Sequence, residues 1–405
     1  MKSNKIRLGE QCVVTSSKRF HLSERITQGV PFYCSKEIIK KFNGEDVTEC
    51  DYISEDLYKK VSNEFGVPKE NDLLITTRGT IGIPYLYKRT DRFYFADGNL
   101  TWIKDFDSNL YSKFLYYWFQ SYEGRKKFEA LAKGTAQKAV PISGIKTLEI
   151  ELPSRKSQKR IADILSAYDD LIENNQKQIK LLEEAAQRLY KEWFVDLRFP
   201  GHENTKTVDG VPEGWNWCKL EDAIQLGPKV TLTKERMKQF IPMSALSTSS
   251  MVLDESQFTE TTSNSGSKFQ NGDTLLARIT PCLENGKTAY VSGIKSDEGA
   301  VGSTEYIVMR AKTINSYMVY LLARTDDFRQ SAINSMSGSD GRQRVKSDKL
   351  KMLDYLHPTS ELVEKFENVQ EPIFEKIYRL SKQMQQAKQA RDLLLPKLMS
   401  GEVEV

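Results

Sequence analysis

The sequence predicts a mixed α/β (α+β) chain in which two globular units are each followed by a long helix. Two observations support this fold class. Short signatures in the first half, built around Asp72, reappear in the second half around Asp273, and such internal similarity is typical of a duplicated unit. A segment without proline or glycine and with a regular apolar stripe separates the halves, and a second segment with a similar stripe ends the chain.

Length and composition allow two or three domains, each with its own core. The chain has 405 residues, of which 39% are hydrophobic and 28% are charged, an ordinary balance for globular proteins. No run approaches about 18 uncharged apolar residues, so no membrane span is expected. The N-terminal residues lack the apolar run of a signal peptide. We therefore expect a cytoplasmic protein.

Cysteine and histidine are sparse and scattered. The five cysteines include no CxxC pair, and the three histidines lie far apart in sequence. This spacing argues against a disulfide framework and against a zinc site. We expect no metal site in this chain.

The first globular unit is expected to span residues 1–153. Short apolar runs such as "DLLIT" and "FYFADGNLTWI" predict strands, and "SKFLYYWFQSYEGRKKFEAL" predicts an amphipathic helix. The aromatic side chains of that helix could stack on bases, but their helical spacing favours the core. Basic residues gather from Glu123 to Arg160. They would form a phosphate-binding surface if the fold placed them on one face, and charge alone does not distinguish this from an ordinary solvated surface.

The first long helix is expected over residues 154–197. Its apolar positions alternate in steps of four and three, which is the heptad pattern of a coiled-coil seam. A helix of this length spans roughly 50 Å at 1.5 Å per residue. Its one clearly polar seam member, Asn175, is of the kind that fixes register at a cost in stability. The predicted seam consists of Ile161, Leu165, Tyr168, Ile172, Asn175, Ile179, Leu182, Ala186, Leu189 and Trp193.

Residues 198–214 are rich in Gly, Pro, Asn and Thr and are expected to form a linker. Residues 215–358 are then expected to form the second globular unit, with Trp215 and Trp217 packing at its entry. Two signatures of the first unit recur here. An aspartate, a short apolar strand and an arginine run from Asp72 to Arg78 and again from Asp273 to Arg278, and a Gly-rich loop with a Gln and basic residues precedes an apolar strand in both units.

The second long helix is expected over residues 359–405. A narrow apolar stripe suits a single partner helix, and the simplest partner is the other helix of the same chain. We therefore expect an antiparallel intramolecular coiled coil. The alternative is that the two helices are buried in larger bundles. Pro372 suggests a late start or a kink, and Pro396 suggests that the end forms a cap and tail. The predicted second seam consists of Ile373, Ile377, Leu380, Met384, Ala387, Arg391, Leu394 and Leu398.

No catalytic motif stands out in the sequence. An adenine methyltransferase would carry F-x-G-x-G and [N/D]-P-P-[Y/F/W] motifs, and neither occurs. A phosphate loop of the G-x-x-x-x-G-K-[S/T] type, G-x-S-x-G and H-E-x-x-H are also missing. The sequence therefore favours a binding and positioning protein over an enzyme.

The whole arrangement resembles the specificity (S) subunit of Type I restriction-modification systems. The resemblance is carried by "LPSRKSQKRIADILSAYDDLIENNQKQIKLLEEAAQRLYKEWFVD", by "VPEGWNWCKLEDA" and by "LPKLMSGEVEV". It implies two target recognition domains that each read one half of a bipartite site in double-stranded DNA. It also implies that the paired helices act as a spacer and that two modification (methyltransferase) subunits and the restriction (translocase and nuclease) subunits are partners. S-adenosylmethionine and ATP would then bind to those partners, and this chain would hold no cofactor.

The best candidates for DNA contact lie in the loops that recur in the two units. Arg and Lys suit guanine and phosphate, while Gln and Asn suit adenine. Each candidate could instead be an ordinary solvated turn residue. A coiled-coil scaffold with two protein-binding domains and no DNA recognition is the alternative function. The candidates are Thr77, Arg78, Lys133, Thr135, Gln137 and Lys138 in the first unit and Arg278, Lys287, Arg342, Gln343, Arg344 and Lys346 in the second.

Overall fold

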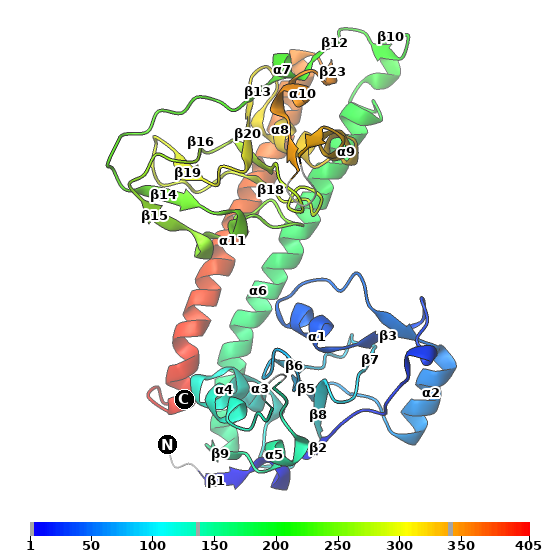
Figure 1. Ribbon diagram of the computed structural model, residues 1–405, viewed down its shortest axis with the longest axis vertical. Helices are drawn as coiled ribbons and strands as arrows, with labels where there is room; N and C mark the ends of the chain where they lie inside the picture. The colour runs from blue at the N-terminus through cyan, green and yellow to red at the C-terminus, as the bar shows by residue number, and fades with distance from the viewer. Residues whose placement is uncertain (1–3, 135–137, 339–342) are drawn as a thin grey trace. The chain divides into compact units, whose positions relative to one another are not determined.

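A computed structural model describes residues 4–134, 138–338 and 343–405 (Figure 1). The chain divides into two compact units. Unit 1 comprises Met1–Asn174 and Met384–Val405, and unit 2 comprises Asn175–Gln383. Each unit mixes helices and sheets, as the sequence predicted. Each unit also contains one segment of each of the two long helices. No helix in the described part of the chain is long and apolar enough to cross a membrane.

Unit 1 is built around an antiparallel sheet whose central strand is fully buried. In that sheet β5 reads "LLIT", a continuous apolar run of the kind found in strands covered on both faces. The sheet has the order β2 (Val13–Thr15), β8 (Leu100–Lys104), β5 (Leu73–Thr76) and β6 (Pro84–Leu86); a second sheet has the order β4 (Asp51–Ile53), β3 (Val30–Tyr33) and β7 (Tyr94–Phe95); and β1 (Asn4–Arg7) pairs with β9 (Glu149–Leu152). The helices of this unit's globular part are α1 (Ser35–Phe42), α2 (Glu55–Glu64), α3 (Ser112–Gln120), α4 (Tyr122–Glu129) and α5 (Ile142–Lys146).

Unit 2 has a corresponding set of elements. Its central antiparallel sheet has the order β13 (Ile224–Leu226), β20 (Tyr306–Ala311), β17 (Thr274–Ala277) and β18 (Thr288–Tyr290); a second sheet has the order β15 (Thr259–Thr261), β14 (Lys238–Ile241), β19 (Ala300–Gly302) and β16 (Ser267–Phe269). Three strand pairs complete it: β10 (Thr207–Val208) with β11 (Val211–Pro212), β12 (Asn216–Lys219) with β23 (Asp354–His357), and β21 (Met336–Ser337) with β22 (Arg344–Val345). Its short helices are α7 (Leu220–Ala223), α8 (Ser316–Ala323), α9 (Asp326–Asn334) and α10 (Ser347–Lys351).

The internal repeat is confirmed at the level of topology. The central sheets β2-β8-β5-β6 and β13-β20-β17-β18 have the same strand order. In the second sheets, the parallel pair β3 and β7 corresponds to the parallel pair β14 and β19. In each unit an early strand pairs with the last strand, as β1 with β9 and as β12 with β23. Two copies of one fold are therefore joined in one chain.

The long helices are α6 (Arg155–Tyr190), which continues into a short π-helical segment (Lys191–Val195), and α11 (Ser360–Ser400). The late start expected from Pro372 and the cap expected from Pro396 onward are wrong. The helix α11 begins before Pro372 and runs past Pro396. A proline inside a helix removes one backbone hydrogen bond and crowds the preceding turn. Here the turns beyond each proline are held by burial, through Phe374 in unit 2 and Leu398 in unit 1.

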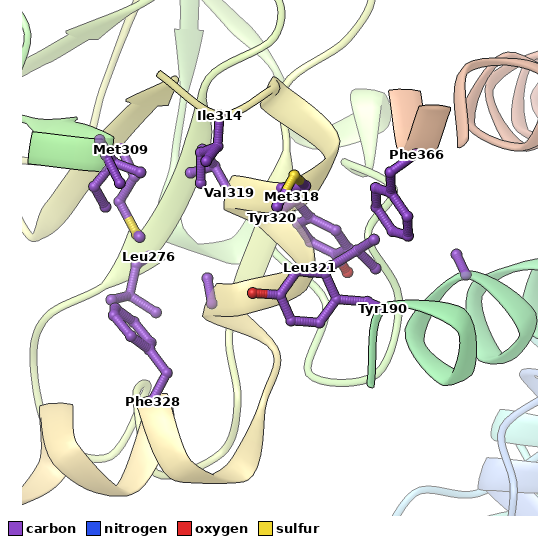
Figure 2. Close-up of a cluster of buried hydrophobic side chains, with 14 of the residues drawn as sticks. Tyr190, Leu276, Met309, Ile314, Met318, Val319, Tyr320, Leu321, Phe328 and Phe366 are labelled. Atoms are coloured by element: carbon purple, nitrogen blue, oxygen red, sulfur yellow. The ribbon is translucent and has the colours of Figure 1, made fainter. Parts of the chain in front are cut away.

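Most of the predicted seam positions are buried, but the buried stripe is wider than a seam for one partner helix. In unit 1, Ile161, Leu165 and Leu398 share a core with Phe114 and Leu115 of α3. In unit 2, Ile179 and Ala186 of α6 and Ile377 and Leu380 of α11 belong to the main core. Figure 2 shows Tyr190 and Phe366 beside Leu321 in that core. The helix segments therefore pack on each other and on the globular part of their own unit.

The two tryptophans at the entry to the second unit differ in role. Trp215 is buried and packs on Phe199, with ring centroids 5.3 Å apart. Trp217 is 62% exposed, so the expected packing role is wrong for this residue. Successive side chains of a strand point to opposite faces, and in the two-stranded pair of β12 with β23 one of those faces meets solvent.

Candidate nucleic-acid interface

The loop after β5 is held in place by backbone hydrogen bonds to two later segments of unit 1. The N–H of Thr77 donates to the carbonyl of Asn99 at 2.9 Å, and the N–H of Val140 donates to the carbonyl of Thr77 at 2.9 Å. Arg78 then forms an antiparallel bridge with Ala139, which also pairs with Lys133. Three of the predicted candidates, Thr77, Arg78 and Lys133, are thereby brought together.

A pocket of about 330 Å³ opens at this meeting point. Arg78 and Lys133 lie on its wall and are exposed. The guanidinium of Arg78 lies over the turn at Gly98, where an added Cβ would be 3.9 Å from it. Thr77 also lines the pocket but is buried, so its side chain supports the loop from within. The pocket thus combines an apolar lining, which includes Leu100 and Val140, with two cationic side chains.

The corresponding loop of unit 2 follows β17 and has the same backbone pattern. The N–H of Arg278 donates to the carbonyl of Glu305 at 3.0 Å, and the N–H of Val345 donates to the carbonyl of Arg278 at 2.9 Å. Ile279 forms an antiparallel bridge with Arg344. The N–H of Thr280 donates to the carbonyl of Gln343 at 3.2 Å. Arg278, Gln343 and Arg344 are therefore neighbours.

These hydrogen bonds show which residues of unit 1 and unit 2 are equivalent. They correct the alignment read from the sequence. Thr77 and Arg278 make equivalent bonds, so the bridge of Arg78 with Ala139 corresponds to that of Ile279 with Arg344. Paired residues of an antiparallel bridge share one face. Arg78 and Arg344 therefore lie on the same face of corresponding bridges, but on opposite strands. Arg278, which the sequence matched with Arg78, is offset from it by one residue.

A carboxylate holds the arginines of unit 2. Arg344 donates from Nε to both carboxylate oxygens of Glu305 at 3.0 Å and from Nη2 to one of them at 2.7 Å. The Nε of Arg278 lies 3.9 Å from the same carboxylate. The hydrogen bonds from Arg344 lower the pKa of Glu305 below its usual range, and Glu305 raises that of Arg344. Sequence reasoning missed Glu305, because its partners lie far from it along the chain.

The aspartates of the repeated signature have structural roles. Asp72 accepts hydrogen bonds from Trp102 Nε1 at 2.8 Å and from the N–H of Lys69 at 2.9 Å, and burial raises its pKa. Asp273 accepts from Gln270 N–H at 2.7 Å and forms a two-point ion pair with Arg310 at 2.6 and 2.7 Å. Both aspartates therefore fix the turn that starts the central strand.

The remaining candidates vary in position. Lys138 and Lys346 are exposed beside the bridges just described. Lys287 is half-buried and donates from Nζ to the carbonyl of Met243 at 2.9 Å, an internal contact that ties down its charge. No cluster of metal-binding side chains is present in the part of the chain that the structure describes. Thr135, Gln137 and Arg342 lie outside the described residues.

Comparisons with known proteins match the first half of the chain to a family model and most of the chain to a named relative. Residues 3–184 match the family model described as "Type I restriction modification DNA specificity domain". The chain is 28% identical over 304 residues to the Type I restriction enzyme MjaIX specificity subunit of Methanocaldococcus jannaschii, and the match covers 73% of this chain and 69% of that protein. It is 34% identical over 140 residues to the EcoAI specificity subunit of Escherichia coli, over 33% of this chain and 24% of that protein.

The likeness extends to a solved structure. The S subunit of a Type-I restriction-modification system from M. genitalium superimposes with a TM-score of 0.61 at 17% sequence identity. That superposition covers 98% of this chain and 96% of the other. At this level of identity it shows a shared fold over both units. The family resemblance read from the sequence is confirmed by the matched domain and the named relatives.

Proposed function

We propose that this chain, a member of the family of Type I restriction-modification specificity subunits, gives such a complex its DNA sequence specificity. Residues 1–153 would read one half of a bipartite target in double-stranded DNA, and residues 215–358 would read the other half. The single observation that carries this proposal is the structural repeat. Two units of the same topology each place one arginine, Arg78 or Arg344, on the same face of a corresponding bridge.

The loops around these arginines have the chemistry that DNA requires. Arginine can donate two parallel hydrogen bonds to guanine, and lysine neutralises phosphate. Exposed Lys133 and Lys138 flank Arg78, and exposed Lys346 flanks Arg344. We propose that the arginines contact bases and the lysines contact the backbone. Gln343 beside Arg344 is the proposed adenine contact of unit 2.

We further propose that α6 and α11 act together as an antiparallel coiled-coil spacer. The two halves of a split site must be met in a fixed phase, because one turn of the duplex takes about 34 Å. A helix of roughly 50 Å is long enough to span more than one such turn. The hydrogen bonds from Asn175 of α6 to Leu380 and Gln383 of α11 support direct pairing of the two helices.

Catalysis is assigned to partner subunits in this proposal. Two modification subunits would dock on this chain and methylate adenine with S-adenosylmethionine, and restriction subunits would supply ATP-driven translocation and cleavage. The sequence motifs of a methyltransferase or a phosphate-loop ATPase are missing from this chain, which supports a non-catalytic role.

Methylation mapping of host DNA tests the proposal directly. We expect a two-part motif with an unspecified gap and a methylated adenine in each half. Arg78→Ala should weaken or relax only the half read by unit 1, and Arg344→Ala only the half read by unit 2. Each loss should be about 5-fold or more in methylation at matched sites, because a two-point arginine contact contributes about 1–3 kcal/mol of discrimination.

Matched controls are available in each unit. Arg92 and Arg236 form exposed ion pairs with Glu55 and Glu298, and their replacement by Ala should leave both half-sites unchanged. If Arg78→Ala and Arg344→Ala affect both halves equally, the proposed division of the reading between the units is wrong. Purified complex whose DNA affinity does not fall with salt would instead support a scaffold without DNA recognition.

A further inference from the structure

Glu305 occupies a position in unit 2 where an acidic residue is unexpected on a DNA-reading surface. It lies in the turn between β19 and β20, and its backbone carbonyl fixes the loop that carries Arg278. Its carboxylate is only 24% exposed and faces Arg344. A carboxylate beside DNA repels phosphate and weakens non-specific affinity. Its presence therefore suggests another role.

The geometry of the ion pair suggests that role. A guanidinium has five N–H donors in a rigid planar fork. Glu305 takes the Nε and Nη2 edge of Arg344, which leaves the edge formed by Nη1 and the second Nη2 hydrogen. That remaining edge has the spacing that matches O6 and N7 of guanine. The side chain of Arg344 is 44% exposed, so this pairing does not remove it from solvent.

We propose that Glu305 is a positioning residue that sets the sequence specificity of unit 2, by holding Arg344 with its free edge directed at a guanine of the second half-site. This inference rests on the proposed function and adds to it the base that one side chain reads. An arginine held at two points loses less freedom when it meets a base, and it cannot swing to a nearby phosphate. Both effects raise discrimination more than affinity.

Unit 1 offers an internal comparison. The carbonyl of Asn99 accepts from Thr77 as the carbonyl of Glu305 accepts from Arg278, so Asn99 and Glu305 occupy equivalent positions. Asn99 carries no charge and cannot form an ion pair with Arg78. Among the described residues, Arg78 has no carboxylate partner that would hold it in one orientation. We therefore expect unit 1 to tolerate substitutions at the corresponding base pair better than unit 2.

The test uses the complex of this chain with its modification subunits and duplexes that carry the mapped motif. Base pairs of each half-site are replaced one at a time, and binding is measured by fluorescence anisotropy over a range of salt. For the wild-type complex, one G·C pair in the half read by unit 2 should discriminate by about 10-fold or more. In Glu305→Gln that discrimination should fall to about 3-fold or less, affinity for a random duplex should rise by about 3- to 10-fold, and the salt dependence should steepen.

Two further variants keep the test decisive. Arg344→Lys keeps the charge but lacks the planar fork that Glu305 can hold at one edge while the other edge meets guanine. It should therefore lose discrimination at the same G·C pair, even if Glu305→Gln fails to fold. Asp354→Asn removes one acidic charge from another ion pair of unit 2, with Lys219 on β12, and should change neither discrimination nor affinity for a random duplex. Thermal unfolding of each complex separates loss of folding from loss of specificity.

The outcomes separate the two proposals. If the wild-type complex prefers the motif and Glu305→Gln retains full discrimination in the second half-site, this inference is overturned and the proposed function stands. The same holds if Glu305→Gln and Arg344→Lys act at different base pairs. If the wild-type complex shows no preference for any bipartite motif, both proposals fall.

Discussion

At the scale of single residues, both copies of the fold have an aspartate before the central strand, but the side chain that each aspartate binds differs. Asp72 and Asp273 both close the turn before the central strand of their unit. Asp72 meets the indole N–H of Trp102, whereas Asp273 meets the guanidinium of Arg310. Loss of the carboxylate charge costs less free energy of unfolding when the partner is a neutral donor than when it is a cation.

This difference predicts unequal effects of the same substitution. Asp273→Asn should lower the free energy of unfolding by about 2 kcal/mol, because it leaves the partly buried Arg310 without its counter-ion. Asp72→Asn should cost less than about 1 kcal/mol, because an amide oxygen still accepts from Trp102 and Lys69. Urea denaturation measures both, with Asp348→Asn as an exposed control. Equal losses at the two positions would contradict this reading.

At the scale of elements, the long helices are joined by polar contacts placed along an apolar seam. Arg391 of α11 occupies a predicted seam position and donates to Asp169 of α6 at 2.7 Å. The second carboxylate oxygen of Asp169 accepts from the hydroxyl of Tyr117 at 2.6 Å. One carboxylate thus links α6, α11 and α3 within unit 1. A charged seam residue is tolerated here because it is paired and hydrogen-bonded.

Breaking this link should destabilise unit 1. Asp169→Ala should cost about 1–2 kcal/mol, because the hydroxyl of Tyr117 loses its acceptor while Arg391 keeps Asp392 as a partner. The double variant Asp169→Ala with Tyr117→Phe should recover most of that loss, since it also removes the hydroxyl that lacks an acceptor. Thermal unfolding of the wild type and of both variants measures these losses. Glu375→Ala, which breaks an exposed pair with Arg379, should cost about 0–0.5 kcal/mol.

At the scale of the whole molecule, the C-terminal segment completes the first unit. Met384–Val405 belongs to unit 1 together with Met1–Asn174. Leu398 is buried in the core that includes Ile161, Leu165 and Phe114. The globular part of unit 1 is therefore completed by residues that follow unit 2 along the chain. Folding of unit 1 is coupled in this way to the last segment of α11.

This coupling predicts a long-range effect of a C-terminal substitution. Leu398→Ala should destabilise unit 1 by about 2–5 kcal/mol, the usual cost of removing a buried leucine side chain. Hydrogen exchange should then speed up across residues 100–165 and remain unchanged across residues 215–358. Leu393, five residues earlier on the same helix, is 68% exposed, and Leu393→Ala should change exchange in neither unit. Faster exchange across both units would contradict the prediction.

Much of the architecture could be predicted because it depends on short sequence patterns. Heptad spacing predicted both long helices, since a periodic apolar stripe identifies a helix without knowledge of its partner. The recurrence of Asp, strand and loop revealed the duplication, because both copies need the same turn before a buried strand. Arg78 and Arg344 were found as candidates because they lie in those recurring loops.

The tertiary structure alone decided the features that depend on segments distant in sequence. Only the structure showed that the bridge of Arg78 with Ala139 is equivalent to the bridge of Ile279 with Arg344. It also revealed the contact of Glu305 with Arg344. Helix α11 continues through Pro372 because packing against other elements overrides local preference. Trp217 is exposed because one face of the pair of β12 with β23 meets solvent. Sequence periodicity determined which elements form. Strand pairing and burial determined which side chains meet, since those contacts join residues that no local pattern connects.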